Sequence, residues 1–206
     1  MKKLANIITQ EGLSGIPARI RHRYYLKTRI YRIDLSGRDF KAGPSRYRFV
    51  ALAEAHLEEL SRQHPEEFTV EKKRQFRERL TEEATDKVFL VIDQQEKILN
   101  YSCVSFGAAY EPRIRYLIQA IPGNLYLFDD YTFAFHRNRG VHSFALRCRL
   151  KIALEMGCRT ASCMIDDGNL ASERVFTKIG FQPVGIIHTW FLKGVTLKIR
   201  QGEWSW

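Results

Sequence analysis

The sequence predicts a mixed α/β fold in which helices flank one sheet. Segments rich in β-branched and aromatic residues alternate along the chain with segments that place apolar residues at helical spacing. The pattern is sharpest after residue 140, where it gives the order helix, strand, helix and strands. The 206 residues, of which 45% are hydrophobic, suffice for one domain of roughly 150 residues with an extension.

The positive charge of the chain is concentrated near its N-terminus. The chain has 33 Lys and Arg residues against 23 Asp and Glu residues, a formal net charge of +10. Residues 1–48 contain twelve of the basic and three of the acidic residues, so they carry +9 and the remaining 158 residues carry +1. We therefore expect a basic N-terminal extension at residues 1–27 and a domain at 28–206. The extension fits a solvated arm, a surface that docks on anionic lipid or on a lipid-linked or nucleotide-linked substrate, or, less well, a contact with nucleic acid.

In the first half of the chain, turn-forming residues separate short predicted elements. Apolar residues at helical spacing predict two short amphipathic helices within residues 3–23. The expected elements that follow are strands at 31–35 and 47–52, helices at 54–63 and 70–83, a hairpin of 86–92 with 97–107, and a strand at 125–135. The helix at 70–83 is densely charged, and we interpret its charges as a solvated face.

In the second half, Val141, Ala145 and Cys148 form an apolar stripe at helical spacing. Asn169 is a favourable N-cap for a further helix. The expected elements are a helix that begins at Val141 and ends before Gly157, a strand at 160–165, a helix from Asn169 to Ile179, and strands at 182–192 and 195–200.

A glycine-containing turn precedes the helix that begins at Val141. It reads Arg137-Asn138-Arg139-Gly140-Val141-His142-Ser143. Such a turn presents unpaired backbone N–H groups and the positive end of the helix dipole, which suit a pyrophosphate, and its arginines add positive charge. The patterns GxxxxGK[ST] and GxGxxG are both absent. By itself, the turn fits either a phosphate site or an ordinary basic helix start.

A second motif lies at the start of the next helix. Residues 169–181 read NLASERVFTKIGF and match the pattern N-x-x-S/A-x-x-x-Y-x-x-x-G-F, with Phe176 in the Tyr position. Together with the turn at 137–140, this segment resembles the GCN5-related N-acetyltransferase (GNAT) superfamily, whose other motif is R/Q-x-x-G-x-G/A. The resemblance covers about residues 125–190. It implies a central, mostly antiparallel sheet with a V-shaped split and flanking helices.

The resemblance further implies that acetyl-CoA or another acyl-CoA is the co-substrate. The turn would bind the CoA pyrophosphate through its N–H groups, and the end of the preceding strand would bind the pantetheine arm. The implied binding residues are Thr132, Phe133, Ala134, Arg137, Asn138, Arg139, Gly140, Val141, His142, Ser143, Asn169 and Phe176. His142 stands where the family has Gly or Ala, and either contacts the phosphate or is merely tolerated. Phe176 lacks the hydroxyl that often protonates the departing thiolate, but a thiol with a pKa near 8.5 leaves tolerably without it.

An amine acceptor that attacks the thioester directly in a ternary complex is also implied by the resemblance. A base or a water chain must remove a proton from the ammonium before it can attack. The candidate catalytic residues are Asp129, Asp130 and Tyr131. Alternation along the strand directs the two carboxylates to opposite faces, and both also fit plain positions at the end of a sheet. The basic N-terminus resembles GNAT proteins of bacterial surface-polysaccharide pathways, which acylate amino sugars. The expected function is N-acyl transfer, and the alternative is a non-catalytic acyl-CoA-binding or scaffold protein.

Other functional classes are disfavoured. The four cysteines form no CxxC pair, and His136 and His142 lack ligand spacing, so we expect no metal site. We expect His136 to face solvent in a loop. Because neither a signal peptide nor an apolar run of about 20 residues is evident, we expect a cytoplasmic protein, either free or peripheral at the inner membrane surface.

Overall fold

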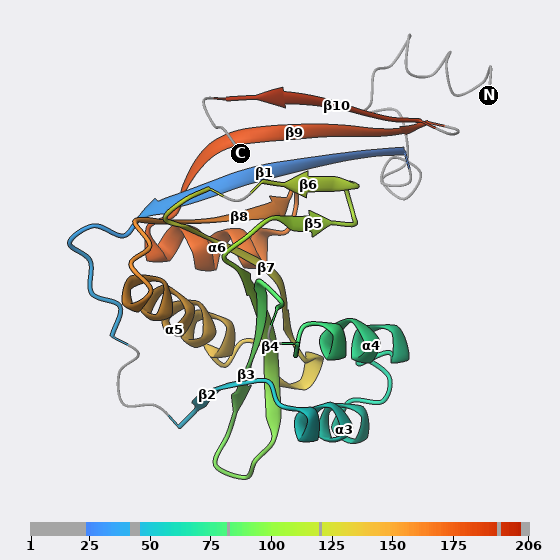
Figure 1. The fold of residues 1–206 in the computed structure, drawn as a ribbon, viewed down its shortest axis with the longest axis vertical. Coiled ribbons are helices and arrows are strands. Elements are labelled where there is room, and N and C mark those ends of the chain that lie inside the picture. The colour runs from blue at the N-terminus through green and yellow to red at the C-terminus, as the bar shows by residue number, and fades with distance from the viewer. Residues whose placement is uncertain (1–23, 42–45, 82, 120, 193–194, 203–206) are drawn as a thin grey trace.

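The computed structural model describes residues 24–41, 46–81, 83–119, 121–192 and 195–202 (Figure 1). Its elements are β1 (Tyr25–Asp34), β2 (Arg48–Ala51), α3 (Glu54–Gln63), α4 (Val70–Glu78), β3 (Asp86–Ile92), β4 (Ile98–Ser105), β5 (Ala109–Glu111), β6 (Tyr116–Ile118), β7 (Asn124–Thr132), α5 (Val141–Glu155), β8 (Thr160–Asp166), α6 (Leu170–Ile179), β9 (Gln182–Leu192) and β10 (Val195–Gln201). A 3₁₀ turn at Ala134–His136 follows β7. The helices predicted within residues 3–23 lie outside the described residues.

Eight strands form one sheet in the order β10-β9-β1-β8-β7-β4-β3-β2, and β5 and β6 form a separate hairpin. Within the large sheet, β7 and β8 pair in parallel, and the other neighbouring strands pair in antiparallel fashion. This arrangement confirms the predicted mixed, mostly antiparallel sheet. The two predicted motifs frame the parallel pair, because α5 connects β7 to β8 and α6 follows β8.

Several boundaries differ from the predicted ones. β1 begins at Tyr25 rather than at 31, because residues 25–30 pair with β9 although their own alternation is weak. The helix predicted at 70–83 ends at Glu78, where the N–H of Arg79 donates to Gln75 and Phe76 and closes the last turn. The strand predicted to reach 135 ends at Thr132 and turns. The hairpin β5–β6 was not predicted, since its strands of three residues are too short to show a period.

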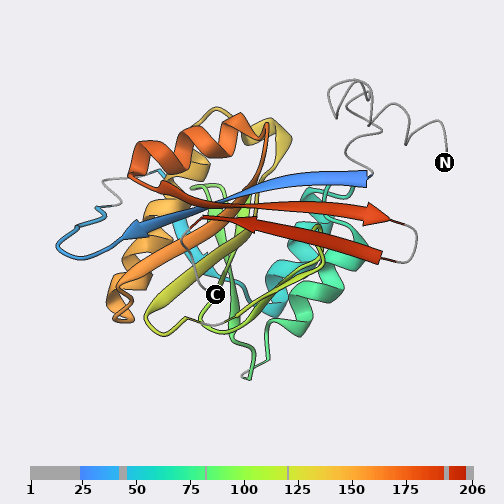
Figure 2. The same cartoon turned by 90° about the horizontal axis from the view of Figure 1, so that it is seen from above.

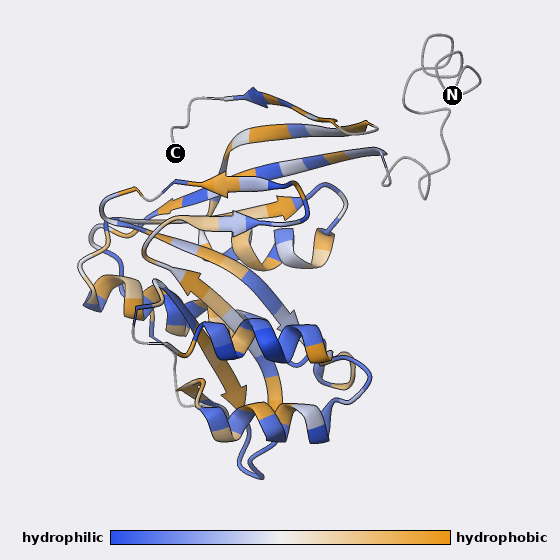
Figure 3. Ribbon diagram, turned by 45° about the vertical axis from the view of Figure 1, so that its right-hand side comes forward, coloured by the Kyte–Doolittle hydropathy of each residue, from blue (hydrophilic) through white to orange (hydrophobic). Residues whose placement is uncertain are grey.

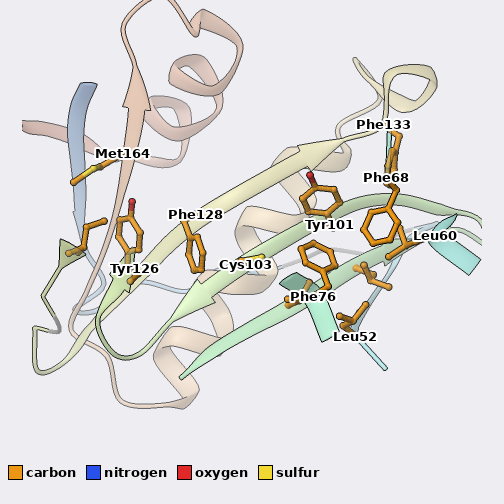
Figure 4. Packing of buried hydrophobic residues seen from close by; sticks show 14 of the residues in the cluster. Leu52, Leu60, Phe68, Phe76, Tyr101, Cys103, Tyr126, Phe128, Phe133 and Met164 are labelled. Carbon is orange, nitrogen blue, oxygen red and sulfur yellow. The ribbon is translucent and has the colours of Figure 1, made fainter. Parts of the chain in front are cut away.

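Helices cover both faces of the sheet, with a hydrophobic core on each side. Leu57 and Leu60 of α3 and Phe76 of α4 pack with Tyr101 and Phe128 on one face (Figure 4). The other core holds buried residues of α5 and α6 against the β1–β8–β7 part of the sheet. The outer sides of α3 and α4 are mostly hydrophilic (Figure 3). The central strands of the sheet are therefore packed on both faces.

The parallel strands β7 and β8 separate part of the way along their length. Their ladder runs from Asn124↔Thr160 to Leu127↔Cys163 and continues no further. At the same level β7 bulges away from the regular β4 register, with Asp129 in the left-handed region at φ 47°. The predicted V-shaped split is thus confirmed, and the two adjacent aspartates lie at its opening.

Candidate functional site

A cleft of about 330 Å³ occupies the split between β7 and β8. Residues 127–131 of β7 and residues 163–166 of β8 form its two sides. α4, the β5–β6 hairpin and the start of α6 add to the lining. The cleft therefore brings together several elements, some of them far apart in the sequence, and all three predicted catalytic residues line it.

Asp129 faces the α4 side of the cleft. Its carboxylate accepts from Lys72 Nζ at 2.9 and 3.0 Å and from Arg79 Nη1 at 2.9 Å. The side chains of all three residues are about one-fifth exposed. Lys72 of α4 and Arg79 at its C-cap, both interpreted from the sequence as part of a solvated face, thus point into the cleft, where they compensate a carboxylate.

Asp130 faces the opposite side of the sheet, toward α5. Its carboxylate pairs with Arg149, lies 3.1 Å from His142 Nε2, and accepts from Asn100 Nδ2 at 2.9 Å. Burial alone would raise the pKa of Asp130, but the charges of Arg149 and His142 lower it well below its usual range. The prediction that the two aspartates point to opposite faces is confirmed. The lowered pKa makes Asp130 a weak proton acceptor.

Tyr131 lies between two charged side chains at the end of β7. Its hydroxyl donates to Glu67 Oε2 at 2.7 Å and accepts from Arg137 Nη2 at 3.0 Å. The hydrogen bond to Glu67 and partial burial raise the pKa of Tyr131. The phenol therefore stays protonated at neutral pH, which suits a proton donor better than a base.

At the end of β7, the backbone groups that face away from β4 are hydrogen-bonded to side chains of the same chain. The N–H of Phe133 donates to Leu99 of β4 at 3.1 Å, so the backbone groups of Thr132 and Ala134 point to the opposite side. There, the carbonyl of Thr132 accepts from Arg137 Nε at 3.0 Å, and the N–H of Ala134 donates to Glu67 Oε2 at 3.1 Å. Glu67 and Arg137 thus hold the backbone groups that were expected to bind a pantetheine arm.

The predicted phosphate turn has the shape of an anion cradle. Asn138 and Gly140 both adopt positive φ, of 60° and 78°, and Gly140 is the N-cap of α5. Within the described residues, no side chain caps this helix, so its first N–H groups face outward without a side-chain acceptor. Residues 137–140 are exposed, and Arg139 stacks over the ring of Phe135 at 5.1 Å. Arg139 can therefore add charge beside the open helix end.

His142 points into the split rather than out of the turn. Its ring lies edge-on to Phe176 at 5.7 Å and beside Asp130. Phe176 is 5% exposed and also packs on Phe181. His142 was expected either to contact a phosphate or to be merely tolerated, and in the ligand-free chain its ring is instead turned inward beside Asp130.

Asn169 caps α6, since its side chain accepts from the N–H of Ser172 at 3.3 Å, and it also lines the cleft. The expectation for His136 was wrong: the residue is buried at 4% exposure, because the 3₁₀ turn directs it inward toward His64.

No group of three potential metal ligands occurs among the described residues. None of the described helices is long and apolar enough to cross a membrane.

Three of the side chains in the site were missed by sequence reasoning. Glu67 lies in the loop before α4, where no hydrophobic periodicity marks it. Its carboxylate accepts from the backbone N–H of Ala134, 67 residues later in the chain. Arg149 lies on the apolar side of α5 and is fully buried. A charged residue among the apolar positions of this helix was the one sequence feature that could have identified it. Nothing in the sequence distinguished Arg79 from the other charged residues of the segment 70–83.

Comparisons with known proteins support the fold. No family model matches the chain, and no curated protein matches it. Among solved structures, a candidate acetyltransferase of the GNAT family from Novosphingobium aromaticivorans matches with a TM-score of 0.54, 11% identity, and coverage of 80% of this chain and 62% of that one. A GCN5-related N-acetyltransferase from Kribbella flavida matches with a TM-score of 0.51, 12% identity, and coverage of 82% and 60%. A transcriptional regulator from Bacillus halodurans matches with a TM-score of 0.51, 16% identity, and coverage of 66% and 93%.

The chain thus spans about three-fifths of the length of the first two proteins. At these identities the likeness concerns the fold alone, which is GNAT-like. The structural neighbours include proteins named as acetyltransferases.

Proposed function

We propose that the protein is an acyl-CoA-dependent N-acyltransferase, which transfers an acetyl or other acyl group to a primary amine such as an amino sugar. The observation that carries this proposal is the split between β7 and β8, with an uncapped helix N-terminus beyond the end of β7 and a cleft beside Asp129. This arrangement offers N–H donors for a pyrophosphate, a strand edge for an extended arm, and space for an acceptor where the strands separate.

On the donor side, the N–H groups of Val141, His142 and Ser143 would bind the pyrophosphate, and Arg139 would add a mobile positive charge. The backbone groups of Thr132 and Ala134 would bind the pantetheine arm. Because Glu67 and Arg137 hold those groups in the ligand-free chain, both side chains have to move when acyl-CoA binds. Asn169 and Phe176, which line the cleft, would shape this path, whereas Phe133 is fully buried and its N–H donates to the carbonyl of Leu99, so it does not offer the binding group expected of it.

The reaction needs one proton removed and one proton supplied. The acceptor nitrogen forms a bond to the carbonyl carbon of the thioester, the C–S bond breaks, and the CoA thiolate leaves with the bonding electrons. We assign Tyr131 as the group that protonates the thiolate, because its raised pKa keeps the phenol protonated. Water removes the proton from the attacking amine.

The two aspartates receive electrostatic roles in this proposal. Asp129 lies on the α4 side of the cleft, where an incoming ammonium can replace Lys72 as its partner. Asp130 holds Arg149 and His142 in place, and its lowered pKa argues against a role as the base. The acceptor would be an amine that carries anionic groups, such as a nucleotide-linked amino sugar, since Lys72 is released when the ammonium replaces it at Asp129 and can then pair with an anionic group.

A second candidate is a non-catalytic acyl-CoA-binding or scaffold protein. It is favoured by the occupied edge of β7 and by Phe176, which has no hydroxyl to offer the leaving thiolate. The two candidates differ in turnover but share the binding of acyl-CoA.

Calorimetric titration with acetyl-CoA and longer acyl-CoAs tests the shared part. We expect micromolar binding that Arg139→Glu weakens by about tenfold, because a repulsive charge replaces an attractive one beside the pyrophosphate. Binding of pantetheine-thioester fragments that lack the pyrophosphate should be unaffected by Arg139→Glu, and this is the matched control. Absence of binding to every acyl-CoA would refute both candidates.

Release of free CoA thiol with a panel of amines, including nucleotide-linked amino sugars, then separates the two candidates. Amine-dependent thiol release with formation of an amide supports the transferase. Tight binding of acyl-CoA without thiol release on any amine of the panel supports the scaffold.

A further inference from the structure

A buried arginine beside the cleft has two hydrogen-bond donors without a partner. Arg149 of α5 is fully buried and is also one of the residues that line the cleft. Its Nη2 group donates to the carboxylate of Asp130. Its Nε and Nη1 groups are buried as well and meet no acceptor among the described residues. Buried donors are almost always paired in folded proteins, because an unpaired donor loses its bonds to water without replacement. The two groups therefore indicate a ligand atom that the chain does not supply.

The charge of Arg149 favours an anion as this ligand. A guanidinium remains protonated at physiological pH and offers only donors. Its bonds to a carboxylate are roughly twice as strong as bonds between neutral groups. Asp130 balances the charge of Arg149 in the ligand-free chain, and His142, 3.1 Å from the same carboxylate, supplies a second positive charge when it is protonated. Because Arg149 is already removed from water, binding requires the desolvation of the ligand carboxylate alone.

The side of the sheet on which Arg149 lies assigns the anion to the acyl donor and not to the acceptor. α5 and α6 pack on one face of the sheet, and α3 and α4 pack on the other (Figure 2). Arg149 belongs to the same helix as the phosphate turn, whereas Asp129, the proposed partner of the acceptor ammonium, faces α4. The CoA pyrophosphate itself is out of reach, since Arg149 lies about 12 Å along the helix from Val141. The anion is therefore at the acyl end of the donor.

The level of Arg149 along β7 matches the expected position of the acyl group. The proposed pantetheine-binding groups belong to Thr132 and Ala134. A strand rises about 3.3 Å per residue, so Asp130, which holds Arg149, lies about 7 Å beyond Thr132 along β7. At this level the ladder between β7 and β8 has already ended. A donor whose arm runs from the phosphate turn along the end of β7 thus directs its acyl group between the strands, toward Arg149.

We propose that the transferred acyl group carries a terminal carboxylate, as in malonyl-, succinyl- or glutaryl-CoA, and that Arg149 binds this carboxylate through Nε and Nη1. Nη2 keeps its bond to Asp130, so the ion pair stays intact and holds the guanidinium in place. In the transfer, the acceptor nitrogen forms the amide bond and the CoA thiolate leaves, while the terminal carboxylate is unchanged and remains on the product. This inference rests on the proposed acyltransferase function and names its acyl group.

Calorimetric titration of the full chain with paired acyl-CoAs tests the proposal. The pairs are malonyl-, succinyl- and glutaryl-CoA, each with the methyl ester of its terminal carboxylate, which differs mainly in charge. We expect the tightest of the three acids to bind about tenfold more tightly than its own ester and than acetyl-CoA. Equal affinity for every acid and its ester would overturn this inference and leave N-acyl transfer standing. Absence of binding to every acyl-CoA would overturn both.

A variant identifies the group that selects the charge. Asp130→Asn/Arg149→Met removes both members of the ion pair, so no buried charge is left alone, and it should bind each acid no more tightly than its ester. The control Arg147→Lys changes an arginine of the same helix that does not line the cleft, and it should keep the tenfold preference. Circular dichroism shows whether both variants are folded. A preference that persists in Asp130→Asn/Arg149→Met would overturn the role of Arg149. The comparison of acid with ester uses the original chain, so it decides the proposal even if this variant does not fold.

Discussion

Two polar clusters on the same strand, β7, differ in burial and therefore in what they can do. Around Asp130, the guanidinium of Arg149 is fully buried and the carboxylate side chain is 15% exposed. At the end of the strand, Glu67 and Arg137 bind backbone groups of Thr132 and Ala134 at the surface. A buried ion pair is costly to break, because each charge would remain without solvent, whereas water can replace a partner at the surface. The first cluster is therefore structural, and the second is exchangeable for a ligand.

Removal of the buried carboxylate should have the largest effect. Asp130→Asn leaves Arg149 without a counter-charge, and we expect it to lower the free energy of unfolding by about 3–5 kcal/mol, measured by urea denaturation. Glu67→Gln, in the surface cluster where water can replace a lost partner, serves as the control and should lower it by no more than about 1 kcal/mol. The combined change Asp130→Asn/Arg149→Met should recover much of the loss, because it removes both charges. Equal losses for Asp130→Asn and Glu67→Gln would contradict the distinction.

Acid should weaken the fold through the same carboxylate. The pKa of Asp130 is lowered in the folded state, so the folded chain resists protonation and the unfolded chain, with a pKa near 3.9, binds the proton first. The stabilisation is present above about pH 4 and is lost as pH falls through the lower, folded pKa. Urea midpoints measured from pH 5 to pH 2.5 should fall less steeply for Asp130→Asn than for the original chain. A parallel decline in the two would show that other carboxylates dominate.

The smallest effect is expected at the surface cluster. Glu67→Gln weakens the charge-assisted bonds to Ala134 and Tyr131 by about 1 kcal/mol, which should raise the affinity for acyl-CoA about fivefold while the stability hardly changes. Glu66→Gln, which alters the exposed neighbouring side chain, is the matched control. A lower affinity after Glu67→Gln would mean that Glu67 supports the ligand rather than competing with it.

Local patterns predicted much of the fold. The helix at 54–63, the start of α5 at Val141 and the cap of α6 at Asn169 agree with the structure, because caps and apolar stripes act within a few residues. The split also agrees, although it was expected from the resemblance of two motifs and not from periodicity. The hairpin β5–β6 was missed because three-residue strands carry no period.

The candidate site was predicted in part. The sequence predicted that Asp129, Asp130 and Tyr131 lie on one strand. The alternation of side chains along a strand predicted that the two carboxylates point in opposite directions. The partners of these carboxylates could not be predicted, because Lys72 comes from α4, Arg79 from the C-cap of α4 and Arg149 from α5, and no local rule relates these segments to β7. The bulge at Asp129 likewise arises from the β4 register and not from the residue itself.

The sequence alone determined the order of most elements, the open helix end at Gly140 and the uneven distribution of charge, since each depends on neighbours along the chain. Only the tertiary structure decided which charges are buried, that Glu67 and Arg137 occupy the edge of β7, and that two donors of Arg149 meet no acceptor among the described residues. Those features depend on contacts between segments distant in sequence. Burial then fixes the energetic weight of each contact, because the cost of separating two charges is set by the solvent that remains around them.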